Sequence, residues 1–84
     1  MLFKTSAKIP QAFPPHKVII KATSLRSPSR ALAYIDRELD GGYIIVNKQH
    51  EHRIVITIHC GNAQYELLKL SFVKDMGEDF IWKD

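Results

Sequence analysis

The chain has very little cysteine and no long apolar run. Cys60 is the single cysteine among 84 residues, so an internal disulfide is excluded and nothing favours an oxidising compartment. The longest wholly apolar run is Ala-Leu-Ala-Tyr-Ile at 31–35, far below the ~20 residues that a membrane helix needs. The first residues contain lysines and prolines but no apolar segment typical of a secretory signal. We therefore expect a cytoplasmic protein.

Acidic residues are missing from one end of the chain. Residues 1–30 hold six Lys and Arg and no Asp or Glu, whereas residues 75–84 hold four acids and one lysine. The formal net charge of +3 hides this polarity. Such polarity can steer an encounter with an acidic or nucleic-acid-bearing partner, and it is also compatible with ordinary solvation of a small surface.

The length fits one domain, and the 45% hydrophobic and 25% charged residues are typical of globular proteins. Residues 1–15 contain three of the four prolines and predict an irregular lead-in or a short edge strand near 1–4. Residues 16–22 form a β-branched run that predicts a strand.

Residues 27–40 give the clearest helix signal. Ser27 suits the N-cap, Pro28 suits the first helical position, and Gly41 suits the left-handed C-terminal cap. Apolar residues recur at helical spacing between these ends and predict one buried stripe: Pro28, Ala31, Leu32, Ile35 and Leu39.

Alternating or β-branched segments follow the helix. They predict strands at 43–48, 52–59 and 64–73, with a possible short strand at 80–83. Short turns between strands indicate an antiparallel meander. The expected fold class is α+β, with a four- to five-stranded antiparallel sheet, one helix on one face, and the order β-α-β-β-β.

The residue types that usually carry chemistry do not form a site in this pattern. His52 and His59 lie seven residues apart on one predicted strand, about 23 Å at ~3.3 Å per residue, and on opposite faces. With His50 and Cys60 they therefore do not predict a metal site. Cys60 beside His59 does not predict a catalytic pair, because adjacent strand residues point to opposite faces. We expect no enzyme, no cofactor and no metal.

Nucleic-acid binding is the main alternative suggested by the residues alone. Arg26 and Arg30, at the start of the predicted helix, are placed to contact a phosphate backbone. However, the strand at 52–59 offers Arg53, Val55 and Thr57 on its outer face, without the aromatic pair of RNA-binding sheets. Direct nucleic-acid binding is therefore kept as the second interpretation.

The expected contact surface combines the start of the helix with the neighbouring strand faces. Tyr34 lies off the apolar stripe, and exposed tyrosines often anchor protein interfaces. Cationic side chains accompany it. The predicted partner-binding residues are Arg26, Arg30, Tyr34, Arg37, Lys48 and Arg53.

The whole chain resembles phage-encoded anti-CRISPR proteins, in particular the second family of type I-E CRISPR–Cas inhibitors. The resemblance lies in the length, the Met-Leu-Phe-Lys start, the Ala-Thr-Ser-Leu segment at 22–25 and the strands after the two glycines at 41–42. It implies a stoichiometric, non-catalytic inhibitor in the bacterial cytoplasm that binds the Cascade surveillance complex. The sequence does not determine the oligomeric state and is compatible with a monomer or a weak dimer, since an exposed edge strand can support a dimer. The family has no catalytic motif, so no site residue is carried over. The alternatives are a small basic nucleic-acid-binding accessory domain, or a module that binds another host protein.

Overall fold

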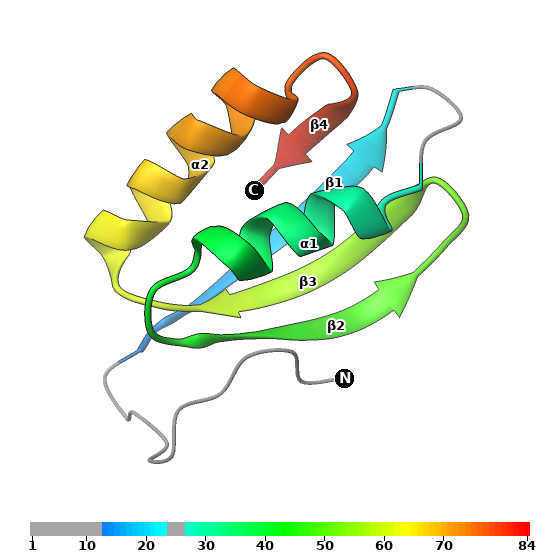
Figure 1. Cartoon of the computed structure of the whole chain (residues 1–84). Helices are drawn as coiled ribbons and strands as arrows, with labels where there is room; N and C mark the ends of the chain where they lie inside the picture. Colours follow the sequence, from blue (N-terminus) through cyan, green and yellow to red (C-terminus); the bar gives the residue numbers. More distant parts are fainter. Residues whose placement is uncertain (1–12, 24–26) are drawn as a thin grey trace.

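The computed structural model describes residues 13–23 and 27–84, and in this part of the chain it contains four strands and two helices. Figure 1 labels them in chain order. Their bounds are β1 Pro15–Ala22, α1 Ser29–Glu38, β2 Tyr43–Gln49, β3 Arg53–His59, α2 Asn62–Met76 and β4 Phe80–Lys83. The predicted edge strand near 1–4 falls outside the described residues.

The sheet has the order β2-β3-β1-β4, and each pair of neighbouring strands is antiparallel. β1 and β2 both run antiparallel to β3, so α1 joins two parallel strands that are separated by β3. In the same way α2 joins β3 to β4 across β1. Two interleaved β-α-β units of this kind make the ferredoxin-like arrangement. The predicted α+β class and antiparallel sheet are confirmed.

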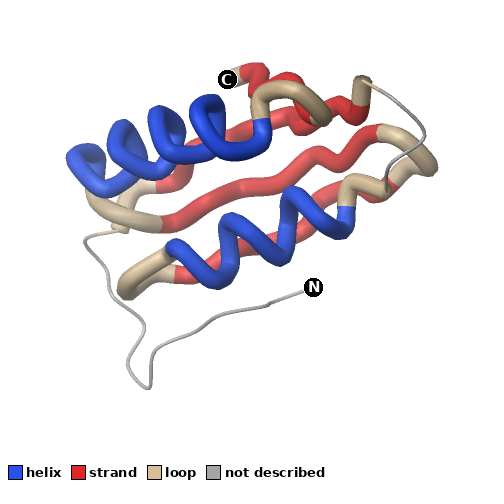
Figure 2. The backbone as a smooth tube through the Cα atoms, turned by 45° about the horizontal axis from the view of Figure 1, so that its top comes forward, coloured by secondary structure: helices blue, strands red, loops and turns tan. Residues whose placement is uncertain are grey.

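Both helices cover the same face of the sheet, as Figures 1 and 2 show. The core lies between these two layers, where strand side chains of one parity meet the inner faces of the helices. Its fully buried aliphatic and aromatic residues include Val18, Ile20, Ile35, Leu39, Ile44, Ile54, Ile56, Ile58 and Phe72. Phe80 is also buried and Trp82 partly buried, as expected for core residues.

α1 is shorter than the helix predicted at 27–40: Pro28 is its N-cap and Leu39 its C-cap, so neither Ser27 nor Gly41 occupies the cap position predicted for it. The helix begins at Ser29, and the Ser27 hydroxyl oxygen accepts a hydrogen bond from the Ser29 amide at 3.2 Å. At the other end the backbone turns through Gly41 and Gly42, whose φ angles are +78° and +84°. Side chains are strained in this left-handed region, which explains a glycine at each position.

The strand predicted at 64–73 is wrong, because these residues lie inside α2. Tyr65, Leu68 and Phe72 recur at helical spacing and are buried, whereas Leu70 is 68% exposed. The outer face of α2 is itself apolar, so Leu68, Leu70 and Phe72 imitate the alternation of a strand. The order over residues 13–23 and 27–84 is therefore β-α-β-β-α-β, with two helices and four strands.

Candidate functional site

Alternation along the strands determines which side chains lie on the side of the sheet away from the helices, which we call the open face. Val18 and Ile20 of β1 are fully buried beneath the helices. Successive strand residues point to opposite faces, so Lys17 and Lys21 project from the open face. Arg53 of β3 has the same orientation, because it pairs directly with Lys21.

Strand pairing gathers further cations on this open face. Ile19 lies opposite Val55 on one side and opposite Lys83 on the other. Lys48 of β2 pairs with Val55 next to a register shift in the β2–β3 ladder. The face thus combines aliphatic side chains with five exposed basic ones, which we call the cationic face: Lys17, Lys21, Lys48, Arg53 and Lys83.

No acidic residue occurs in any of the four strands. All nine Asp and Glu residues of the chain lie in the helices or in the segments that connect or follow the elements. Asp84, directly after β4, turns to the helix side, where it accepts hydrogen bonds from Tyr65 at 3.1 Å and from Lys69 at 2.7 Å. The sheet therefore presents charges of a single sign on its open face.

A pair of rings closes one end of the cationic face. Tyr43 and His59 are partners across β2 and β3, and their rings stack with centroids 4.4 Å apart and planes 11° from parallel. Both side chains are half-buried. Further along the face, Thr57 donates a hydrogen bond to the Asn47 side-chain oxygen at 2.8 Å. The open face thus offers rings at its edge, although its centre is aliphatic.

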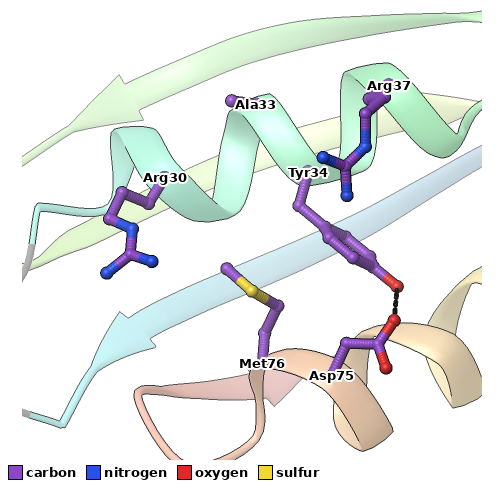
Figure 3. A pocket seen from close by; sticks show the side chains of 6 residues that line it. All are labelled: Arg30, Ala33, Tyr34, Arg37, Asp75 and Met76. Atoms are coloured by element: carbon purple, nitrogen blue, oxygen red, sulfur yellow. Dashed lines mark hydrogen bonds between the residues drawn. The ribbon is translucent and has the colours of Figure 1, made fainter.

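A second surface lies on the opposite side of the domain, between the two helices. A hollow of about 550 Å³ lies there. Figure 3 shows the side chains that line it: Arg30, Ala33, Tyr34, Arg37, Asp75 and Met76. The Tyr34 hydroxyl donates a hydrogen bond to the Asp75 carboxylate at 2.7 Å. The Arg37 guanidinium lies 5.3 Å from the centre of the Tyr34 ring. The hollow is therefore edged by two arginines, and one partly buried hydrogen bond connects α1 and α2 across it.

Tyr34 corrects one sequence-based expectation. It was expected to be exposed, but only 6% of the residue is accessible, because its ring packs edge-on against Phe72. Burial, reinforced by the hydrogen bond to Asp75, raises the pKa of Tyr34 to about 12. Its hydroxyl therefore stays protonated over the ordinary pH range and ties the helices together.

The structure divides the six predicted partner-binding residues between the two surfaces. Arg30, Tyr34 and Arg37 come together at the hollow, whereas Lys48 and Arg53 belong to the cationic face behind the sheet. Arg26 falls outside the described residues. The five described residues of this set therefore do not lie on one surface.

The prediction also missed the lysines that complete the cationic face. Lys17 and Lys21 were not connected with Arg53, because the pairing of β1 with β3 was unknown. Lys83 was missed for the same reason, since it depends on β4 pairing with β1. The signal present in the sequence was the absence of acids from the predicted strands at 16–22, 43–48, 52–59 and 80–83.

Cys60 and the histidines do not form a reactive cluster. Burial raises the pKa of the Cys60 thiol to about 11, so the unreactive thiol form dominates at neutral pH. His16 contacts the Cys60 carbonyl oxygen at 3.2 Å and stacks on Tyr65. Within residues 13–23 and 27–84, no group of three or more His, Cys, Asp or Glu side chains is placed to hold a metal ion.

Comparison with known proteins finds no matching family model, no similar curated protein and no similar solved structure. In the part of the chain that the structure describes, neither helix is long and apolar enough to cross a membrane. We therefore infer the function from the two surfaces themselves, because a fold alone does not determine function.

Proposed function

We propose that this chain is a non-catalytic domain that binds single-stranded nucleic acid on the open face of its sheet. The observation that carries the proposal is the cationic face, with five Lys and Arg side chains and no acid in any strand. Phosphate contacts by such side chains supply most of the affinity of sequence-independent nucleic-acid binding.

The shape and chemistry of this face favour a single strand over a duplex. Lys17 and Lys21 lie about 13 Å apart at ~3.3 Å per residue, so they can follow a phosphate backbone across the sheet. Ile19 and Val55 between them offer an apolar surface for exposed bases, and the Tyr43–His59 pair offers a ring at the edge. A duplex keeps its bases stacked inside and would use the charges alone.

The expected affinity is modest and strongly dependent on salt. If all five cations each neutralise one phosphate, the logarithm of the binding constant should fall with the logarithm of salt concentration with a slope of about −3.5, at ~0.7 per contact on a single strand. The dissociation constant at physiological salt should lie at roughly 10⁻⁴ to 10⁻⁶ M, the usual range of non-specific binding. The central positions lack stacking rings, which argues against tighter, base-specific binding.

The hollow between the helices supports a second candidate function, inhibition of the Cascade complex by protein binding. Arg30 and Arg37 are exposed there, and arginine is among the residue types that carry most binding energy at protein interfaces. This candidate agrees with the resemblance to type I-E inhibitors. Both candidates place the protein in the cytoplasm, where their partners occur.

Two matched charge reversals separate the candidates. Lys17→Glu with Lys21→Glu changes the open face, and Arg30→Glu with Arg37→Glu changes the hollow by the same net charge. All four side chains are exposed, so both double variants should keep the wild-type melting behaviour. Fluorescence anisotropy measures binding to each partner in turn: a labelled single-stranded oligonucleotide, its duplex form and purified type I-E Cascade.

The proposal predicts that only the Lys17/Lys21 variant loses affinity for the single strand, by roughly tenfold or more, with a salt slope that is shallower by about 1.4, for two lost contacts. Equal losses in the two variants would mean that net charge alone drives binding, which contradicts a specific open-face site. Binding to Cascade that is lost only in the Arg30/Arg37 variant, without binding to the oligonucleotide, would make the second candidate the working account.

A further inference from the structure

Helix α2 exposes a stripe of large apolar side chains on the face opposite the core. Leu67 is 66% exposed, Leu70 68% and Val73 53%. The buried positions of the same helix, Tyr65 and Leu68 among them, point to the sheet. Contiguous exposed apolar residues on a small domain mark an interaction surface more often than isolated ones. We call Leu67, Leu70 and Val73 the α2 stripe.

The charges beside the stripe are arranged symmetrically about its middle. Glu66 lies four residues before Leu70 and Lys74 four residues after it, and both are exposed. At 3.6 residues per turn these two side chains fall about 40° to either side of Leu70 around the helix. Leu67 and Val73 are likewise equally distant from Leu70, three residues before and three after. The sequence of this face thus has opposite charges at its two ends and apolar residues between them.

A face with this pattern is complementary to itself in one orientation only. If two α2 helices pack antiparallel with Leu70 at the two-fold axis, Glu66 of one copy lies level with the partner's Lys74, and the same pairing repeats at the other end. Leu67 lies level with the partner's Val73. A parallel arrangement would instead bring like charges together at both ends, which is unfavourable. The charge pattern therefore selects an antiparallel, isologous contact.

We propose that the α2 stripe is a homodimer interface in which α2 packs antiparallel against α2 of a second copy of this chain. A smaller hollow of about 210 Å³ lies beside the stripe and is lined by Glu38, Gln64, Leu67, Leu68 and Ser71. It borders the end of α2 that faces the partner's Lys74, so Glu38 adds negative charge where the partner brings positive charge.

The proposed dimer leaves the nucleic-acid proposal intact and does not depend on it. The stripe points away from the sheet, so the two helix layers meet in the middle and both cationic faces remain on the outside. The contact consists of three apolar side chains per copy, so it buries less surface than the ~800 Å² per partner of a standard stable interface. We therefore expect a dimer that forms with rising concentration and not a permanent one.

Sedimentation velocity from micromolar to millimolar protein tests this interface. The wild-type mass should rise from that of the 9.7 kDa monomer towards the dimer as concentration increases. Leu70→Asp should remain monomeric at every concentration while its melting temperature at low concentration stays unchanged, because the side chain is exposed. A wild-type chain that stays monomeric throughout would overturn the proposal, and so would a dimer that persists in Leu70→Asp, since the contact would then lie elsewhere, for example at a sheet edge.

A charge swap tests the antiparallel register independently of the apolar contacts. Glu66→Lys and Lys74→Glu should each weaken dimerisation by roughly fivefold, because exposed like charges then meet at both ends of the contact. The double variant carries opposite charges at both ends again and should recover the wild-type dimerisation constant. A double variant as weak as the single ones would contradict the antiparallel register.

Discussion

Replacing Leu70 and Phe72 separately by alanine tests whether α2 is a helix and whether it packs on the core as the structure shows. Phe72 is fully buried against Tyr34, Phe80 and Trp82, whereas Leu70 is 68% exposed. Truncating a buried phenylalanine typically costs about 3–5 kcal/mol of unfolding free energy. Truncating an exposed leucine should change it by about 0.5 kcal/mol or less. A domain of this size has a total stability of roughly 4–13 kcal/mol, so Phe72→Ala removes a large share.

Urea denaturation followed by circular dichroism measures both losses, at a protein concentration low enough to keep the chain monomeric. The prediction is a large fall in the urea midpoint for Phe72→Ala and almost none for Leu70→Ala. A strand at 64–73 would place positions 70 and 72 on the same face of the sheet. Comparable losses in the two variants would therefore refute the helix and the core arrangement built on it.

Two further perturbations probe the turn after α1 and the buried ionisable groups. Gly42→Ala should destabilise the fold more than Gly41→Ala. Both changes cost about 1–2 kcal/mol because the backbone is left-handed at each position, but only at Gly42 does an added Cβ clash with the His59 carbonyl oxygen. Equal losses of unfolding free energy in chemical denaturation would rule out that clash. Burial raises the pKa of Cys60 from 9.0 to about 11 and that of Tyr34 from 10.0 to about 12. The unfolded chain then releases these protons first, so stability should be complete below pH 9 and fall as pH rises through 11. Thermal melts across this pH range measure the fall in stability. In Cys60→Ala the fall should begin only at about pH 10, the ordinary pKa of Tyr34. A rise in stability above pH 9 would contradict the raised pKa values of these two buried groups.

The sequence predicted the elements whose periodicity and end signals agree. The helix at 27–40 was found because Ser27 and Gly41 bracket an apolar stripe, and the strands at 16–22, 43–48, 52–59 and 80–83 match β1 to β4 closely. At 64–73 the two periodicities compete, because Leu67, Leu70 and Val73 make the outer face of α2 apolar as well. A helix that is apolar on both faces loses the contrast on which pattern reading depends.

The candidate site was less predictable than the fold because it is built by strand pairing over long distances in the sequence. Lys21 meets Arg53 only because β1 lies next to β3, and Lys83 joins them only because β4 lies on the other side of β1. A meander, as the sequence predicted, would have placed different strands in contact. Because α2 was predicted as a strand, the predicted strand order was wrong. The strand order determines which cations lie next to one another on the open face.

The most direct test of the account is the affinity of the wild-type chain for a single-stranded oligonucleotide, measured across a series of salt concentrations alongside the Lys17→Glu/Lys21→Glu variant. The account predicts measurable binding with a slope of about −3.5 in the wild type and a slope shallower by about 1.4 in the variant. Wild-type binding that is absent at low salt, or a slope that the variant leaves unchanged, would contradict the proposal that the open face of the sheet binds nucleic acid.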